Sequence, residues 1–277
     1  MEIPLPERVE ARKCLLAAAK RLPLSLDPDS PPPIPERMLA LMERIRYLMD
    51  IEESFGIEPL IKFGNVEVGE GETERAMACY KRAAVRAEEN GDDRLAGVAL
   101  ANMGVVLTGK RQFNMALRML QQAVSHAVKA EDMATRSQAL YYMGVTFKQL
   151  EQPMMARQTF EQALDAAHSD DRLDLVARCL QNLAWFEVAD KEPARAIEYL
   201  RRALDVYAQT GNTMDQLRAY YNIGLVYADQ NDFASAIRHL ERAREIRNLR
   251  EVEYEGDRIE KAIEAVRVRQ RELGAQS

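Results

Sequence analysis

The feature that most constrains this 277-residue chain is a pattern that recurs every 40 residues. A small residue marks each of five copies, and alanine returns twelve and nineteen positions later in every copy. The small residues are Gly64, Gly104, Gly144, Ala184 and Gly224, and the alanines are Ala76, Ala116, Ala156, Ala196, Ala236, Ala83, Ala123, Ala163, Ala203 and Ala243. A period kept without insertion or deletion predicts one structural unit that is copied along the chain and stacks on its neighbours.

Each copy predicts two helices. In the second copy, apolar Leu100, Met103 and Leu107 stand four before, one before and three after the small residue, which is the spacing of one helical stripe. Positions twelve, sixteen and nineteen after it make a second stripe, with a large apolar residue at the sixteenth, such as Leu120. The small residue is expected to let the two helices approach closely.

Proline and glycine mark the expected helix boundaries. Pro153 and Pro193 share one repeat position and suit the first turn of a helix, where a missing N–H leaves no bond unmade. Gly91 and Gly211 share another position and suit a left-handed residue that ends a helix. Helix caps or first-turn acids are expected at Asp92, Asp93, Asp170 and Asp171, and a capping box at Thr213 and Gln216.

One copy carries a family resemblance. Its sequence, YNIGLVYADQNDFASAIRHLERA from Tyr221 to Ala243, resembles a tetratricopeptide repeat in its aromatic–Asn–aliphatic–Gly run, its Asp–aromatic turn and its two packing alanines. The other copies match the same frame less fully, so the resemblance spans residues 57–249. It implies an all-α fold, a right-handed α-solenoid superhelix of five helix-turn-helix repeats. Units of 40 residues in place of the usual ~34 imply longer helices, similar to those of kinesin light chains and bacterial peptide-sensing regulators.

Residues 1–56 lie outside the repeat frame. The proline-rich segment 22–35 predicts a stiff, extended connector, with a ligand for another domain as the alternative. Residues 36–55 predict an amphipathic helix that caps the exposed end of the repeats. The alternative is an adaptable surface that binds a partner or a second copy of the chain. The apolar face of this predicted helix consists of Met38, Leu41, Met42, Ile45, Leu48 and Met49.

Residues 250–277 predict a C-terminal solvating helix followed by a tail. A narrow apolar stripe of Ile259, Ile263 and Val266 stands among charged residues there. Positions that are apolar in the earlier copies become Arg244 and Arg247 in the fifth. The last repeat has no further repeat to bury its face, so a helix with a polar outer side is expected to cover it.

Composition excludes several classes of function. The net charge of −6 disfavours a general nucleic-acid binder. Cys14, Cys79 and Cys179 lie far apart, which argues against a disulfide framework or a zinc site and favours buried helix residues over reactive thiols. No continuous apolar stretch is as long as a membrane span, and the N-terminus does not resemble a signal peptide. A cytoplasmic location without membrane contact is therefore expected.

Catalysis is not expected. The three histidines have no metal-ligand spacing, and no residues assemble a nucleophile, a base and an oxyanion site. We therefore expect no enzyme activity, no metal and no cofactor.

The resemblance implies that the first helices of the repeats line a concave groove. Several polar and aromatic residues fall on the predicted free face of these helices, including asparagines whose amides can pair with any peptide backbone. Aromatic residues beside arginine are typical of binding hot spots, and the positive charge favours an acidic group on the ligand. The predicted partner-binding residues are Lys62, Asn102, Tyr141, Tyr142, Lys148, Arg178, Asn182, Trp185, Arg218, Tyr221 and Asn222.

A structural role for these residues is the alternative, because asparagine is common here in the family and aromatic residues also fill the core between repeats. The function that follows is a protein–protein interaction scaffold that holds a partner segment in the groove. A peptide-responsive regulator and a self-assembling scaffold, a homo-oligomer through residues 36–55, remain as alternatives.

Overall fold

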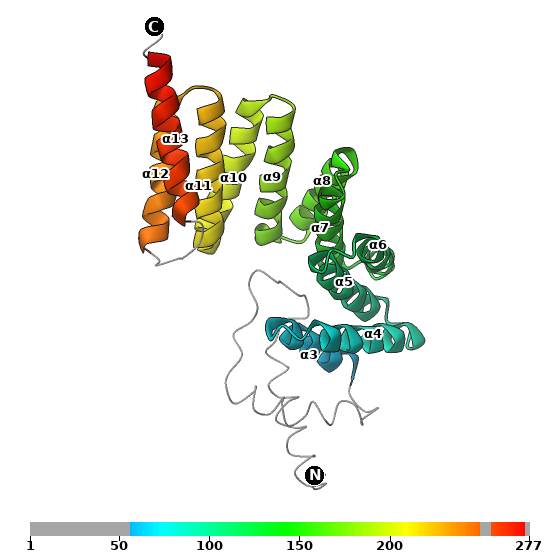
Figure 1. The fold of residues 1–277 in the computed structure, drawn as a ribbon. Helices are drawn as coiled ribbons and strands as arrows, with labels where there is room; N and C mark the ends of the chain where they lie inside the picture. The colour runs from blue at the N-terminus through cyan, green and yellow to red at the C-terminus, as the bar shows by residue number, and fades with distance from the viewer. Residues whose placement is uncertain (1–55, 250–255, 275–277) are drawn as a thin grey trace, which may run out of the picture. The chain divides into compact units, whose positions relative to one another are not determined.

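The computed structural model describes residues 56–249 and 256–274, and these residues form eleven helices and no strand (Figure 1). The expected all-α fold of paired helices is confirmed. The helices are α3 (Ile57–Gly69), α4 (Thr73–Glu89), α5 (Asp93–Gly109), α6 (Phe113–Lys129), α7 (Met133–Gln149), α8 (Pro153–Ser169), α9 (Leu173–Ala189), α10 (Pro193–Thr210), α11 (Thr213–Asp229), α12 (Phe233–Leu249) and α13 (Gly256–Gly274). Cys14, the proline-rich segment 22–35 and the predicted helix 36–55 lie outside the described residues.

The helices fall into two compact units. Unit 1 is Met1–Gln152 and contains α3–α7, and unit 2 is Pro153–Ser277 and contains α8–α13. The boundary divides the predicted third repeat between its two helices, which the sequence pattern did not indicate. Each unit is a series of helical hairpins in which every helix packs on the next.

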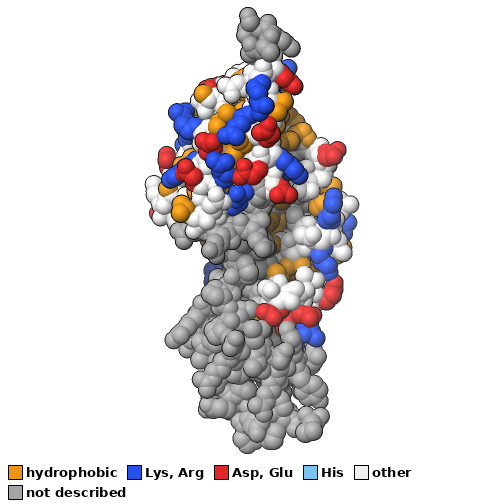
Figure 2. Space-filling view, turned by 60° about the vertical axis from the view of Figure 1, so that its left-hand side comes forward, with side chains coloured by type: hydrophobic (Ala, Val, Ile, Leu, Met, Phe, Trp, Pro, Cys, Tyr) orange, Lys and Arg blue, Asp and Glu red, His pale blue; other side chains and the backbone are white. Residues whose placement is uncertain are grey.

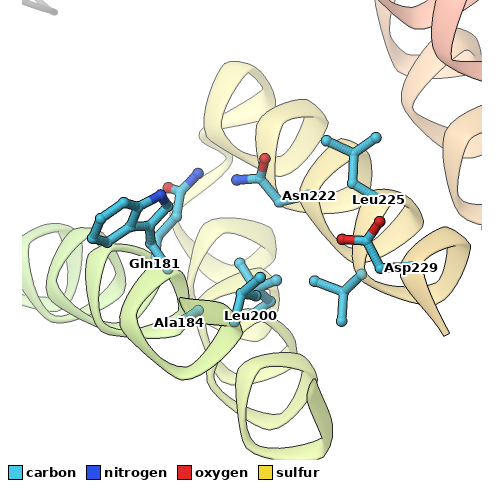
Figure 3. A pocket seen from close by; sticks show the side chains of 9 residues that line it. Gln181, Ala184, Leu200, Asn222, Leu225 and Asp229 are labelled. Carbon is cyan, nitrogen blue, oxygen red and sulfur yellow. The ribbon is translucent and has the colours of Figure 1, made fainter. Parts of the chain in front are cut away.

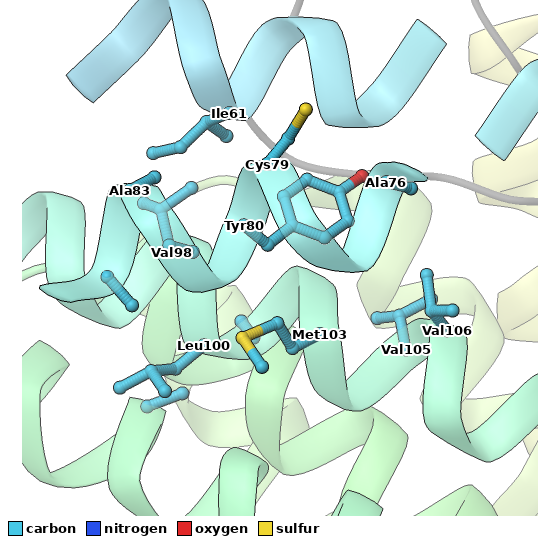
Figure 4. Packing of buried hydrophobic residues seen from close by; sticks show 14 of the residues in the cluster. Ile61, Ala76, Cys79, Tyr80, Ala83, Val98, Leu100, Met103, Val105 and Val106 are labelled. Carbon is cyan, nitrogen blue, oxygen red and sulfur yellow. The ribbon is translucent and has the colours of Figure 1, made fainter. Parts of the chain in front are cut away.

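Close approach at the small-residue position organises the hairpins. A Cβ atom on Gly224 would lie 2.7 Å from Leu240 Cγ, and one on Gly64 or Gly104 would overlap Tyr80 or Leu120 in the same way. The large residue sixteen positions later therefore rests directly on the glycine backbone. The two helices approach closely there, as the sequence predicts. Figure 4 shows Tyr80 within the core of unit 1, between Ile61 of α3 and Met103 of α5.

The corners repeat every 20 residues. Nine residues there have positive φ, and only Gly71, Gly91 and Gly211 are glycine. The other six are Arg111, Glu131, Glu151, Asp171, Lys191 and Asn231. At each corner the next backbone N–H donates to a carbonyl five residues earlier, for example Asp92 N to Ala87 O at 2.8 Å. These bonds satisfy helix-end carbonyls and hold the left-handed residue in place.

The helix starts confirm some expectations and correct others. Pro153 and Pro193 begin α8 and α10, and Asp92 caps α5 by accepting from Leu95 N at 2.9 Å. Asp170 and Asp171 do not cap α9, because that helix begins at Leu173 and its N-cap residue is Arg172.

The predicted capping box at Thr213 is also displaced by one residue. Asn212 is the N-cap of α11, and its Oδ1 accepts from Asp215 N at 3.2 Å. Gln216 instead donates to the carbonyl of Tyr207 at 2.9 Å, which ties α11 to the end of α10.

A charged network replaces an apolar contact in unit 2. Glu187 is buried at the repeat position that Leu107 and Phe147 occupy in unit 1. Its carboxylate is 3.4 Å from Arg157 Nη1 of α8 and 3.5 Å from Arg195 Nη1 of α10. The buried carboxylate therefore links three helices at a position where Leu107 and Phe147 make apolar contacts, while the first repeat has a buried glutamate, Glu67, at the same position.

Helix α13 packs on α11 and α12 and covers the last repeat. Ile259, Ile263 and Val266 are buried in one apolar cluster with residues of α11 and α12. Arg247 of α12 lies 3.3 Å from Glu260, which explains a charge where earlier copies are apolar. Figure 2 shows acidic and basic side chains interspersed on the face it brings forward, which suits a solvent-facing end.

The glycine contact gives a direct test of the packing. Gly104→Ala places a methyl group on the fully buried Leu120 side chain, so we expect the free energy of unfolding to fall by about 1–3 kcal/mol. Gly109→Ala in the same helix is the control, because a Cβ there meets nothing within 4 Å. Urea titrations followed by circular dichroism compare the two variants, and equal stabilities would contradict the packing described here.

Candidate functional site

The eleven predicted binding residues divide between the two units. Unit 1 carries Lys62, Asn102, Tyr141, Tyr142 and Lys148, and unit 2 carries Arg178, Asn182, Trp185, Arg218, Tyr221 and Asn222. The two groups differ in how far solvent reaches them.

In unit 1 the predicted residues are largely enclosed. The sequence placed Asn102 on an exposed face, whereas its exposed fraction is 0%. Its Nδ2 donates to Asn65 Oδ1 at 3.0 Å, and the Tyr80 hydroxyl donates to the same oxygen at 2.8 Å. One carbonyl oxygen thus joins side chains from α3, α4 and α5. Asn102 therefore serves internal packing in this structure.

The other predicted residues of unit 1 are also covered in part. Lys62 is buried and lies 4.0 Å from the Glu58 carboxylate. Tyr142 is buried and meets Tyr141 edge-on, with ring centroids 5.2 Å apart. Burial lowers the pKa of the Lys148 ammonium below its ordinary value, because desolvation disfavours the charged form.

In unit 2 the same repeat positions surround two adjoining hollows. The first has a volume of about 200 Å³ and lies between α9 and α11, with Leu200 of α10 beneath them. Figure 3 shows Gln181 and Asn222 on its two sides, with Asp229 further along α11. Most of its lining is apolar, and its residues are Gln181, Ala184, Trp185, Val188, Leu200, Asn222, Leu225, Val226 and Asp229.

Trp185 is the aromatic residue among those that line this hollow. Its side chain is 49% exposed and meets Phe186 edge-on, with ring centroids 5.0 Å apart. Val188 and Leu225 extend the apolar surface beside it, and both are exposed. An exposed indole flanked by aliphatic groups can bury apolar surface of a ligand at little entropic cost.

The second hollow is basic. It has a volume of about 180 Å³ and is lined by Gln181, Leu217, Arg218, Tyr221, Asn222, Arg258 and Ile259. Arg218 Nη1 donates to Asp215 Oδ1 at 2.9 Å, and the Arg258 guanidinium lies 5.9 Å from the Tyr221 ring centroid. These contacts orient both guanidinium groups and leave part of each at the hollow.

Two amides belong to both hollows. The Gln181 Oε1 accepts from the Tyr207 hydroxyl at 3.0 Å, which fixes the orientation of that amide. Within residues 56–249 and 256–274, the amide of half-buried Asn222 makes no hydrogen bond. Asn222 thus offers two donors and an acceptor where the hollows meet.

The structure does not place every predicted residue of unit 2 at these hollows. Arg178 and Asn182 line neither of them, and Asn182 Nδ2 donates to the Arg178 carbonyl on its own helix at 3.0 Å. Gln181, Asp229 and Arg258 line the hollows but were not among the predicted residues. Gln181 and Asp229 fall at repeat positions on the predicted free face. The position of Arg258 could have been inferred from the apolar stripe of α13, because Arg258 directly precedes buried Ile259.

The described residues hold no group of three or more His, Cys, Asp or Glu that could bind a metal ion. Their helices also include none that is long and apolar enough to cross a membrane. Cys79 and Cys179 are buried free thiols, and burial raises the pKa of Cys179 well above its ordinary value. Both fit the prediction of buried helix residues.

Both the repeat and the fold have counterparts among known proteins. The sequence model of the tetratricopeptide repeat matches residues 135–209 and 186–248. Residues 135–248 carry tetratricopeptide repeats. A comparison with curated proteins finds no match.

Solved structures share the fold of these tetratricopeptide repeats at low sequence identity. BtubC (BKLC) from P. vanneervenii is 20% identical with a TM-score of 0.64, covering 90% of this chain and 93% of that one. The apo quorum sensor NprR from B. thuringiensis is 14% identical with a TM-score of 0.66, covering 83% of this chain and 63% of that one. A Rap protein complexed with competence and sporulation factor is 14% identical with a TM-score of 0.61, covering 90% and 67%.

The two asparagines at one repeat position give a matched test. Asn102→Ala removes a buried donor to Asn65, so we expect it to lower the free energy of unfolding by about 1–3 kcal/mol. Asn222→Ala removes a half-buried amide that makes no internal hydrogen bond in the described structure and should change stability by less than about 0.5 kcal/mol. Thermal and urea unfolding of both variants check this, and a reversed order would refute the assignment of roles.

Proposed function

We propose that the chain is a non-enzymatic interaction protein that binds a partner peptide segment on unit 2, across the two hollows. The observation that carries the proposal is the position of Asn222 between an apolar hollow and a basic one. An extended peptide could place an apolar side chain beside Trp185 and a carboxylate beside Arg218, while its backbone pairs with the two amides. The tetratricopeptide-repeat fold supports this class of role.

The charged residues at the two ends of the site determine the orientation of the proposed peptide. Asp229 lines the far end of the apolar hollow, and Arg218 and Arg258 line the basic one. Residues 218 and 229 are eleven positions apart on α11, or about 16 Å along the helix axis. About five residues of extended chain cover that length. The ligand should therefore carry its carboxylate at the arginine end and a neutral or positive group near Asp229.

This proposal is tested with a library of random octapeptides, selected on the intact chain and measured through Trp185, the chain's one tryptophan. We expect selected peptides to contain an apolar residue and an acidic residue or free C-terminus. Asn222→Ala and Arg218→Ala should each weaken their binding by about 5–50-fold, the range of one or two lost hydrogen bonds.

Asn114→Ala is the control for the asparagine change, because Asn114 is exposed on α6 in unit 1. It should leave affinity unchanged. Peptides that bind equally well to all three variants would place the ligand elsewhere and overturn the assignment of the site.

A regulatory version of this function is favoured by one observation. Arg258 and Ile259 of α13 form part of the wall of the basic hollow, so a ligand there would contact both α11 and α13. The Rap protein and the quorum sensor NprR have similar folds, and the former is complexed with competence and sporulation factor. Ligand binding on this chain would then tighten the attachment of α13.

Hydrogen exchange separates the regulatory version from a passive scaffold. A saturating selected peptide should slow amide exchange in residues 256–266 at least threefold if the ligand ties α13 to α11. Exchange in α5 should stay unchanged in the same samples, which serves as the internal reference. Protection confined to α9 and α11 would support the passive scaffold and contradict the regulatory version.

A further inference from the structure

One repeat position changes from alanine to tyrosine beneath the two hollows of unit 2. It lies near the end of the second helix of each repeat, and the five copies hold Ala87, Ala127, Ala167, Tyr207 and Arg247 there. The three alanines and Tyr207 are all at most 1% exposed. Unit 2 therefore encloses a phenol ring at a position where the earlier copies enclose a methyl group.

The two ends of residue Tyr207 are held by different helices. Its backbone carbonyl on α10 accepts from Gln216 Nε2 of α11 at 2.9 Å. Its hydroxyl donates to Gln181 Oε1 of α9 at 3.0 Å. Helix α10 packs against both α9 and α11. The side chain therefore crosses the seam between α9 and α11 and ends at Gln181, a residue that lines both hollows.

The first helices of adjacent repeats pack on each other where this position is alanine. Helix α4 carries Ala87 and packs against α3 and α5, which also contact each other directly. Helix α6 carries Ala127 and packs against α5 and α7, which again contact each other directly. The fit beside Ala127 is close, since a Cβ on Gly97 would lie 3.4 Å from Ala127 N. In unit 2, α9 and α11 instead face each other across the hollows.

We propose that Tyr207 is the positioning residue of the candidate site: its ring holds α9 and α11 apart and so opens both hollows. A phenol ring suits this role because it is rigid and has only two side-chain torsions, so its length is fixed. An alanine at the same position would leave the two helices room to approach, as α3 and α5 do beside Ala87.

The hydroxyl of Tyr207 has a separate role. A buried hydroxyl needs a hydrogen-bond partner, and the Gln181 amide provides one at the edge of the hollows. The ring therefore determines the width of the seam, and the hydroxyl allows the ring to be buried there. The spacing of the helices is independent of any ligand, whereas its effect on ligand binding rests on the proposed function.

Acrylamide quenching of Trp185 tests the spacing without a ligand. Trp185 is the chain's one tryptophan, and its side chain on α9 is 49% exposed at the apolar hollow. Tyr207→Leu is too short to cross the seam, so α11 should close toward α9 and cover the indole. We expect the quenching constant to fall by about twofold or more, because closing the unfilled space restores packing contacts. Tyr207→Phe keeps the ring and should quench like the unchanged chain.

Matched controls separate closure from a loss of stability. Tyr199→Leu removes another tyrosine ring from α10, and Tyr199 is half-buried and lines neither hollow, so quenching should stay unchanged. Unfolding would raise the quenching of Trp185, the opposite of closure, and circular dichroism detects it separately. Should Tyr207→Leu lose helical signal, Tyr207→Met replaces it, since unbranched methionine fills the space without holding the helices apart.

Unchanged quenching in a folded Tyr207→Leu or Tyr207→Met protein would overturn the proposal. An equal fall in Tyr207→Phe would also overturn it, because the hydroxyl and not the ring would then keep the helices apart.

The octapeptides selected on the intact chain extend the test to binding. Their affinity should fall about tenfold or more in Tyr207→Leu and stay within about threefold in Tyr207→Phe, because closure removes the space that the peptide side chains occupy. Unchanged affinity in Tyr207→Leu would contradict the positioning role while the effects of Asn222→Ala and Arg218→Ala still support the proposed function. If no octapeptide is selected, the proposed function fails, and the quenching of Trp185 still decides whether Tyr207 sets the spacing.

Discussion

The contact between a glycine and a large apolar side chain sixteen residues later holds three of the described hairpins together. At Gly64, Gly104 and Gly224 no Cβ fits, because the partner side chain lies against the backbone. That approach fixes the spacing and register of the two helices. The alanines at the neighbouring positions are almost fully buried. Each helix pair then presents one face to the next pair.

Sequence alone was sufficient for the hairpins and insufficient for the surface. Periodicity determines which side of a helix faces its partner, so the small-residue contacts, the proline starts and the stripe of α13 could all be read from residue types. Exposure depends on what lies over the remaining side. Asn102 and Asn222 are the same residue type at the same repeat position, but Asn102 donates to buried Asn65 and Asn222 borders two hollows. Nothing in the periodicity distinguishes them.

Other differences have equally local causes. The cap of α11 is Asn212, one residue before the predicted Thr213, because the short amide side chain of Asn212 accepts from Asp215 N. Glu187 is buried where Leu107 and Phe147 are apolar, because arginines from two other helices reach its carboxylate, one of them 30 residues earlier in the chain. The boundary between Gln152 and Pro153 falls inside one repeat, so the compact units do not follow the repeat count.

The candidate site on unit 2 combines three short-range devices. An exposed indole supplies apolar area, oriented arginines supply positive charge, and Asn222 supplies hydrogen-bonding groups between them. Each device sits on a helix and not on a loop, so the packing of α9, α11 and α13 sets the distances between them. A site of this kind recognises the order of side chains along a peptide and needs no catalytic group.

The corners carry a different consequence. Each has the same backbone hydrogen bond across the bend, and glycine, acidic, basic and amide residues all occupy the left-handed position. Because no particular side chain is needed to make the bend, a hairpin can be deleted, duplicated or grafted between corners without rewriting the residues that pack inside it. The number of hairpins is thus a quantity that recombination can change in one step, while point mutation adjusts what each face holds.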